Sequence, residues 1–298
     1  MTISSPSRAE PCNSYRWNWQ GQEFSIVYQT LGQGNPILLL PAFSTVSSRT
    51  EMLKIAEILA PQYRVTVLDW LGFGQSARPP LPYNPELYRQ MLRDFVAASF
   101  DSPVIIAAAG HAAGYALDVA AELPQHVSKL VLVAPTWQGP LRVMGAPAGM
   151  RKAVEGMVRS PLLGQFLYYL NTRPGFLRWM YGRHVFCDRD RLTPEFMNTK
   201  YQSTQQPGAR FAPAAFVTGG LDPVQSRAEF LALIQRVSLP ILAIIAEQAP
   251  PTSKAGMEAI AEASGVQIAR LPGTLGMHEE YPSEVAAAIL NFAHRDIL

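Results

Sequence analysis

Residues 110–114, with the sequence GHAAG, stand where a strand-to-helix turn could carry catalysis. An apolar run of strand length precedes them and a helical pattern follows them. A serine between small residues at such a turn would be an exposed nucleophile, but the central residue here is Ala112. Gly110 and Gly114 preserve the turn, so we expect Ala112 at its tip in the strained conformation. A methyl group cannot attack a carbonyl, which excludes acyl-enzyme chemistry from this position.

His278 is the candidate for acid–base chemistry. It lies in the sequence GMHEEYP, between the last predicted strand and the last predicted helix. A general base needs only reach and a suitable pKa, and an imidazole can supply both. The other histidines are interpreted as ordinary core or surface residues: His111, His126, His184 and His294.

The elements that must position these residues alternate between strand and helix. A hairpin is predicted at 15–34, because apolar and polar residues alternate on both sides of Gly21. Continuous apolar runs, typical of strands covered on both faces, occur at 36–41, 63–70, 102–109, 129–135 and 239–247, with a weaker run at 266–273. Helical patterns occur at 47–62, 84–100, 114–125, 253–264 and 283–297. This order predicts a doubly wound, mostly parallel α/β sheet that binds ligands beyond the carboxyl ends of its strands.

One long interruption breaks the alternation. Between about 138 and 237 the helical segments 148–160, 161–170, 175–186, 194–202 and 226–237 follow one another without a parallel strand, which predicts an inserted helical lid. The alternative is an ordinary helical subdomain. Residues 205–223 are expected to have little helical character and to form either a pocket rim or an irregular connection. We therefore predict a flexible tail at 1–13, a core at 14–137 and 238–298, and a lid at 138–237.

Composition limits the partners and the compartment. The chain has 298 residues, 48% of them apolar, and a net charge of only +2, so nucleic acid is not an expected partner. Cys12 and Cys187 have neither disulfide nor metal-ligand spacing, which predicts a reducing, cytoplasmic setting without a metal or cofactor. No run approaches the roughly 20 apolar residues of a membrane span. The apolar, Arg-bearing helices at 161–184 would permit peripheral membrane contact, although packing onto the core is the preferred interpretation.

Taken in order, these motifs resemble the α/β-hydrolase superfamily. Residues 69–79, DWLGFGQSARP, are similar to its D-x-x-G-x-G-x-S-x-x-P segment, and GHAAG stands at its nucleophile elbow. The sequence LPILAIIAEQAP is similar to the strand that bears the catalytic acid, and LPGTLGMHEEYP to the segment that bears the catalytic histidine. The W-x-W-x-G opening at 17–21 and the LPAF loop resemble a branch common in cyanobacteria and chloroplasts. The likeness begins at about Tyr15 and implies an α/β-hydrolase fold.

The resemblance also exposes departures at the acid and oxyanion positions. The G-x-x-D acid pattern corresponds to 246–249, which leaves Ala249 in the aspartate slot. Glu247, on the same face of an extended chain, could replace it or could simply be solvated. Asp222 is a second candidate, for which we prefer the role of a helix N-cap. At the oxyanion loop, Pro41 and Ala42 replace the usual H-G pair, and Phe43 and Ser44 could still offer N–H groups.

Three explanations of Ala112 remain open. It could replace a native serine in an engineered knockout, leaving a true ester-type hydrolase. The chemistry could instead have moved, either to a hydroxyl such as Ser44 or to His278 acting alone. The nearby Ser47 and Ser48 are better explained as a capping box with Glu51. Finally, the protein could bind rather than convert its ligand, or use the lid surface for a protein partner.

These considerations define one predicted site. The expected catalytic positions are His278, Ala112, Glu247, Ala249 and Ser44. The expected binding residues are Ala42, Phe43, His111, Ala113 and Trp137. A small apolar molecule is the expected ligand, because the alanines make the pocket floor more apolar.

Overall fold

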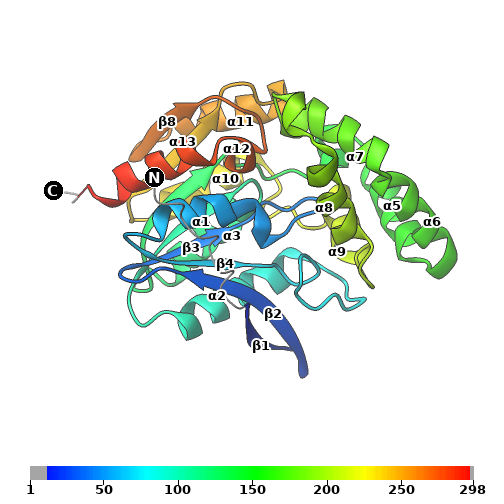
Figure 1. The fold of residues 1–298 in the computed structure, drawn as a ribbon, viewed down its shortest axis with the longest axis horizontal. Helices are drawn as coiled ribbons and strands as arrows, with labels where there is room; N and C mark the ends of the chain where they lie inside the picture. The colour runs from blue at the N-terminus through cyan, green and yellow to red at the C-terminus, as the bar shows by residue number, and fades with distance from the viewer. Residues whose placement is uncertain (1–11, 296–298) are drawn as a thin grey trace, which may run out of the picture.

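The computed structural model describes residues 12–295, which form one eight-stranded sheet in the order β1-β2-β4-β3-β5-β6-β7-β8 (Figure 1). The strands are β1 Asn13–Trp19, β2 Gln22–Leu31, β3 Pro36–Leu40, β4 Arg64–Leu68, β5 Val104–Ala109, β6 Val127–Val133, β7 Ile241–Ala246 and β8 Val266–Leu271. Only the β1/β2 and β2/β4 pairs are antiparallel. The predicted doubly wound, mostly parallel sheet is therefore confirmed.

The first two strands form the predicted hairpin. They are joined at Gln20 and Gly21, whose φ angles of 50° and 81° are both positive. Two successive positive φ angles match the twist of a two-residue hairpin. Gly21 adopts its positive angle without a steric penalty.

Helices cover both faces of the central strands. Every residue of β3, β5 and β7 is buried, which explains their unbroken apolar runs. The covering helices are α1 Leu53–Leu59 and α13 Pro282–Ala293, packed against each other, and α2 Pro85–Ser99, α3 Ala112–Glu122 and α10 Arg227–Arg236, with α3 in contact with both others. Helix α11 Pro251–Ala261 packs on β7 and β8, and the short α12 Met277–Glu280 precedes α13. The expected end of the last helix at 296–297 lies outside the described residues.

The segment between β6 and β7 is helical, as expected. Besides α10 it contains α4 Pro140–Val143, α5 Ala148–Arg159, α6 Pro161–Thr172, α7 Pro174–Met180, α8 Pro194–Thr204 and α9 Phe211–Thr218, with a π-helical turn at Tyr181–Val185 and a 3-10 turn at Arg189–Arg191. Helices α5 and α6 run side by side at one end of the molecule (Figure 1). The expectation of little helical character at 205–223 was wrong, because the alanine-rich α9 is helical and largely buried. Most of the predicted tail, residues 1–11, lies outside the described residues.

Candidate active site

The sharp turn after β5 is made by Gly110, not by Ala112. Gly110 follows the strand directly and has a φ angle of +54°, in the left-handed region. His111 already has helical angles, and Ala112 is the first residue of α3, fully buried and without a positive φ angle. The expectation of a strained Ala112 was therefore wrong: the sharp turn follows the end of β5 at Ala109 directly, where Gly110 takes the left-handed conformation that costs glycine least.

Tight packing explains why glycines flank this turn. A Cβ atom at Gly110 would lie 3.1 Å from the Cβ of Ala42 and 3.6 Å from the Thr136 hydroxyl. A Cβ atom at Gly114, in the first turn of α3, would lie only 2.4 Å from the ring of Pro223. The glycines thus allow the helix and the neighbouring loops to approach closely.

His111 is held by side chains from two loops. Its Nδ1 lies 2.8 Å from the Thr136 hydroxyl, and its Nε2 lies 3.4 Å from Asp222 Oδ1. Asp222 also accepts a hydrogen bond from the Gly139 N–H at 2.7 Å and one from Arg142 at 2.9 Å. The interpretation of Asp222 as a helix N-cap was wrong, because Ser226 caps α10. Asp222 is thus held by two donors, and the hydrogen bond of Nδ1 with Thr136 orients the His111 ring.

His278 is positioned by the loop after β8. The Gly276 N–H donates to the Val185 carbonyl at 3.0 Å, and a Cβ atom at Gly276 would lie 2.4 Å from the Val185 side chain. This close contact ties the loop to the inserted helices and places His278 on α12, almost completely buried. Its Nε2 lies 3.4 Å from Glu51 Oε2, and its Nδ1 has no hydrogen-bond partner among residues 12–295.

Glu51 belongs to a group of four ionisable side chains, Glu51, Lys200, His278 and Glu279, which we call the buried charge cluster. Lys200, from α8, places its ammonium 2.8 Å from Glu279 and 3.3 Å from Glu51. Burial opposes ionisation of Glu51, yet Lys200 and His278 together hold its pKa below the usual value. Burial also opposes the charge on Lys200, but Glu279 and Glu51 raise its pKa well above normal. For Glu279, burial dominates and raises the pKa.

The sequence interpretation missed the role of Glu51. We expected it to complete a capping box with Ser47 or Ser48, but neither serine makes that bond: Ser47 donates to the Ala42 carbonyl, and Ser48 contacts Thr50. The local spacing of a serine and a glutamate cannot show that a distant lysine and histidine compete for the carboxylate. The role of Glu51 therefore became visible only from the long-range contacts of the folded chain.

Within residues 12–295, none of the other predicted catalytic positions is hydrogen-bonded to the His278 ring. Glu247 is exposed, while the carboxylate beside His278 is Glu51. Ala249 is buried and has no ionisable group. The Ser44 hydroxyl accepts a hydrogen bond from the Val46 N–H at 3.2 Å, which is a local turn.

The predicted binding residues are mostly enclosed by other side chains. Phe43 stacks on Trp70 with ring centroids 4.8 Å apart, inside an aromatic cluster. Trp137 stacks on Phe230, also at 4.8 Å. Ala113 is fully buried within α3, whereas Ala42 is half-buried.

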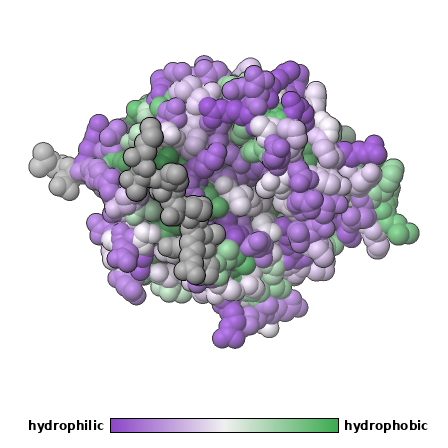
Figure 2. Space-filling model, in the orientation of Figure 1, coloured by the Kyte–Doolittle hydropathy of each residue, from purple (hydrophilic) through white to green (hydrophobic). Residues whose placement is uncertain are grey.

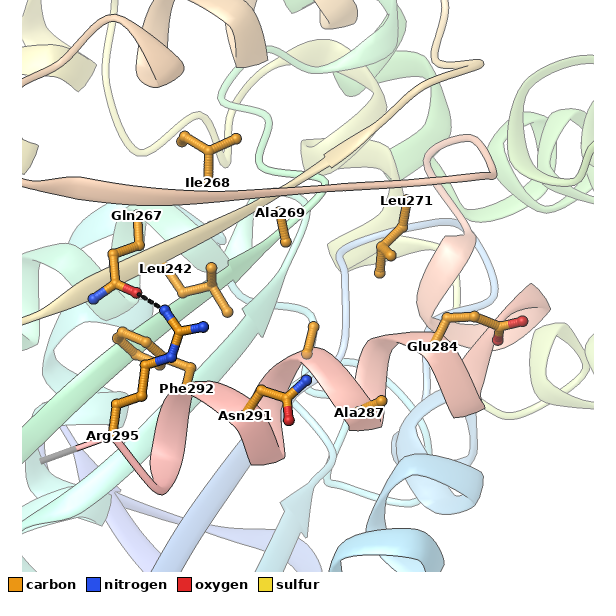
Figure 3. Close-up of a pocket in the computed structure, with 11 residues that line it drawn as sticks. Leu242, Gln267, Ile268, Ala269, Leu271, Glu284, Ala287, Asn291, Phe292 and Arg295 are labelled. Atoms are coloured by element: carbon orange, nitrogen blue, oxygen red, sulfur yellow. Dashed lines mark hydrogen bonds between the residues drawn. The ribbon is translucent and has the colours of Figure 1, made fainter.

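A cavity of about 430 Å³ lies elsewhere, between β8 and α13 (Figure 3). Its walls are largely apolar, with Gln267 and Arg295 hydrogen-bonded across one end at 3.3 Å. A second cavity, of only about 20 Å³, lies beside Trp137 and Thr252. Neither wall includes Gly110, Ala112 or His278. Within residues 12–295, no group of three His, Cys, Asp or Glu side chains is arranged to hold a metal ion.

Comparison with known proteins settles the family. Residues 37–288 match the model of the alpha/beta hydrolase family, which is most of the chain. The chain belongs to the alpha/beta hydrolase family. A curated relative from Metapseudomonas resinovorans, 2-hydroxy-6-oxo-6-(2'-aminophenyl)hexa-2,4-dienoic acid hydrolase, is 32% identical over 108 residues, which span 36% of this chain and 37% of that enzyme.

Solved structures agree on the fold of this alpha/beta hydrolase. A probable hydrolytic enzyme from Pseudomonas aeruginosa matches with a TM-score of 0.74 and 18% identity, covering 98% of this chain and 97% of its own. A serine hydrolase involved in carbazole degradation matches with a TM-score of 0.68 and 20% identity, covering 95% and 99%. At these identities the likeness shows the fold alone.

In this alpha/beta hydrolase the Asp69 motif is structural. The buried Asp69 carboxylate accepts hydrogen bonds from the backbone N–H groups of Arg49, at 2.6 Å, and Gln75, at 2.8 Å, and it pairs with the Arg49 guanidinium. A Cβ atom at Gly74 would lie 2.0 Å from that carboxyl group, so only glycine fits. Because Arg49 stands two residues before Glu51, the motif fixes the turn that presents Glu51 to His278.

Proposed function

We propose that this alpha/beta hydrolase does not cleave esters through an acyl-enzyme. The observation that carries the proposal is the residue at the sharp turn: Gly110 has no side chain at all, and Ala112, two residues on, has only a methyl group. Acyl transfer requires a nucleophile at the turn and a base within hydrogen-bonding reach of it. The exposed position of Glu247 and the apolar Ala249 also support the loss of this chemistry.

We propose that the protein instead binds a small apolar molecule beneath the inserted helices, which then act as a lid. The apolar surroundings of the turn, including Ala42, Ala112 and Ala113, support this ligand class. Because Ala112 and Ala113 are fully buried, entry of the ligand requires the helices to move away from the sheet. Cys12 and Cys187 are free and exposed, which supports the reducing, cytoplasmic setting expected from the sequence.

A labelling experiment tests the loss of acyl transfer. We expect a serine-reactive fluorophosphonate probe to leave the protein unlabelled, and an ester panel to show no turnover that depends on His278. The variants Ala112→Ser and Gly110→Ser should stay inactive, because Glu51 contacts Nε2 of His278, the ring nitrogen that a catalytic triad offers to its serine. Circular dichroism checks that each variant is folded. Stoichiometric labelling of the unmodified protein, or fast ester turnover in folded Ala112→Ser, would show that the chain is a serine hydrolase.

A second experiment locates the ligand. A series of small apolar carboxylates and their neutral analogues is screened for a saturable rise in melting temperature. Hydrogen exchange with the tightest ligand should then show protection at residues 110–116 and 274–280. Protection confined to β8 and α13 would place the ligand in the 430 Å³ cavity instead and contradict the proposed site.

A second candidate function is proton transfer by His278. Glu51 contacts Nε2 of the imidazole, and the buried Nδ1 has no partner among the described residues, so one nitrogen is oriented and the other keeps a free lone pair. A substrate with an acidic C–H bond would fit such a base. Deuterium exchange into an apolar ligand found by the screen, abolished in His278→Gln, would support this function. Equal exchange in that variant would exclude it.

A further inference from the structure

Helix α6 turns its apolar side away from the protein. Its packed face is made by Gly164, Tyr168 and Thr172, spaced four residues apart and all buried. The solvent-facing side carries five large apolar residues: Leu162, Leu163, Phe166, Tyr169 and Leu170. A surface helix ordinarily has the opposite arrangement, with polar residues outward. The sequence interpretation, in which these helices pack their apolar side onto the core, is therefore wrong for α6.

The exposed apolar surface continues onto α7. Phe176 and Trp179, one helical turn apart, are both exposed, with ring centroids 5.7 Å from each other. We call these two residues and the five of α6 the apolar patch. Leu162 is 88% exposed, and Phe166 and Trp179 are each 57% exposed. Figure 2 shows hydrophobic surface at the end of the molecule where Figure 1 places α6. Contiguous exposed apolar surface of this kind marks an interaction site.

The segment that carries the apolar patch is strongly basic. Residues 140–183 contain seven Lys or Arg and a single acidic residue, Glu155, a net charge of +6 in a chain whose total is +2, and only Arg142 of the seven is ion-paired with a carboxylate of the described residues, Asp222. Lys152, Arg173 and Arg183 are exposed. The rest of the chain is therefore net acidic, and the positive charge is concentrated on the segment that exposes the apolar patch.

Arginine and aromatic side chains alternate at the edge of the patch. The Arg173 guanidinium lies 5.1 Å from the Tyr169 ring centroid, and that of Arg183 lies 5.9 Å from the Trp179 ring. Tyrosine, tryptophan and arginine with these neighbours are the residues that favour the boundary between lipid headgroups and acyl chains. In the described part of the chain, no helix combines the length and the apolar character needed to span a bilayer.

We propose that helices α6 and α7 dock onto the surface of an anionic lipid bilayer. Helix α6 lies in the plane of the interface, its leucine and phenylalanine side chains enter the boundary of the acyl chains, and Lys152, Arg173 and Arg183 face the lipid phosphates. The apolar patch alone could bind either lipid or protein. The basic residues beside it favour an anionic bilayer, because such a bilayer presents an apolar interior and negatively charged headgroups at one surface.

Sedimentation with vesicles tests the docking. The full chain is mixed with vesicles of phosphatidylcholine alone and of phosphatidylcholine with phosphatidylglycerol, and we expect binding to the anionic vesicles that weakens as salt rises. The double variant Leu162→Ser/Phe166→Ser should partition about tenfold less or weaker still, since it loses two buried apolar groups. Arg173→Gln should bind about fivefold less. The control Ile58→Ser replaces an exposed apolar residue on α1 and should bind normally.

Tryptophan fluorescence gives a second readout that does not depend on a destabilising change. Brominated lipid in the anionic vesicles should quench Trp179, and this quenching should disappear in Trp179→Phe. Absence of sedimentation with anionic vesicles at low salt would overturn the proposal, as would equal binding by the double variant. A dimer in solution that the double variant dissociates, without vesicle binding, would assign the patch to a second copy of the chain. None of these results depends on catalytic activity, so they are independent of the proposed function.

Discussion

Glu51 links two charged groups that the sequence places far apart, Lys200 and His278. With both carboxylates ionised, Glu51, Glu279 and Lys200 hold two negative charges and one ammonium, so a proton on Glu279 makes these three groups neutral. Uncompensated charge is costly away from water. Burial is the largest cause of the raised pKa of Glu279, and a raised pKa favours the neutral carboxyl that a charge-balanced cluster needs. The cluster thus joins α8, α12 and the turn after β3 through direct contacts of charged side chains.

Replacing Glu51 by glutamine should reveal this tie. The change removes the charged acceptor that contacts both Lys200 and His278, so we expect the free energy of unfolding to fall by about 2 kcal/mol. Because the folded-state pKa of Glu51 is lowered, its contribution is complete above its unfolded-state pKa and is lost as the pH falls through the lower, folded-state pKa. Urea unfolding between neutral and acidic pH should therefore show a shallower acid loss in the variant than in the unmodified protein.

Glu57→Gln provides the matched control, because Glu57 lies on the neighbouring α1 and is exposed. It should leave the unfolding free energy nearly unchanged at every pH. A similar loss of stability in both variants would mean that the buried charge cluster has no special role.

At the scale of the element, α3 is fixed by how closely its first turn approaches other segments. Gly110 supplies the left-handed turn, and Gly114 allows the helix to rest on Pro223. The backbone of Pro223 is itself fixed, because its carbonyl accepts a hydrogen bond from Arg89. The proline ring therefore has little freedom to retreat from a larger residue.

Gly114→Ala should destabilise the protein although alanine favours helix. The added methyl would lie 2.4 Å from Pro223 Cγ, and such overpacking typically costs about 1–3 kcal/mol, more than the gain in helix propensity of about 1 kcal/mol. Gly156→Ala on α5 is the control, since nothing lies within 4 Å of its added methyl. Thermal unfolding should show a lower melting temperature for Gly114→Ala and an unchanged or higher one for Gly156→Ala. The opposite order would show that close packing does not select Gly114.

At the scale of the whole molecule, one buried carboxylate joins the inserted helices to the core. Glu280, at the end of α12, accepts hydrogen bonds from the backbone N–H groups of Cys187, at 3.0 Å, and Asp188, at 2.7 Å. Its carbonyl accepts another from Arg191. Since α12 also carries His278, a movement of the insertion is coupled to the position of that histidine.

Glu280→Ala should loosen the insertion without unfolding the sheet. Hydrogen bonds to a charged acceptor contribute about 1.5–3 kcal/mol each, so hydrogen exchange at residues 181–192 should become about tenfold faster or more. Exchange in β5 and β6 should change little. An equal increase throughout the chain would indicate a global loss of stability and contradict the coupling.

Much of the fold could be predicted from the sequence because it follows local patterns. The apolar runs gave the six central and edge strands of the parallel region, and Gly21 marked the hairpin. The position of the sharp turn was misjudged: β5 ends at Ala109 as predicted, but the positive φ angle falls on Gly110 and not on Ala112. Residues 205–223 were misjudged because glycine and proline punctuation hid the short helix α9.

By itself, the sequence determined that this chain folds as an alpha/beta hydrolase and that neither Gly110 nor Ala112 can attack a carbonyl, since both facts depend on residue type and order. Only the tertiary structure decided which carboxylate meets His278 and which side of α6 faces solvent. Glu51 and His278 are 227 positions apart, and their contact arises when two loops pack together. The outward side of a helix likewise depends on which neighbours cover it, and periodicity alone cannot specify those neighbours.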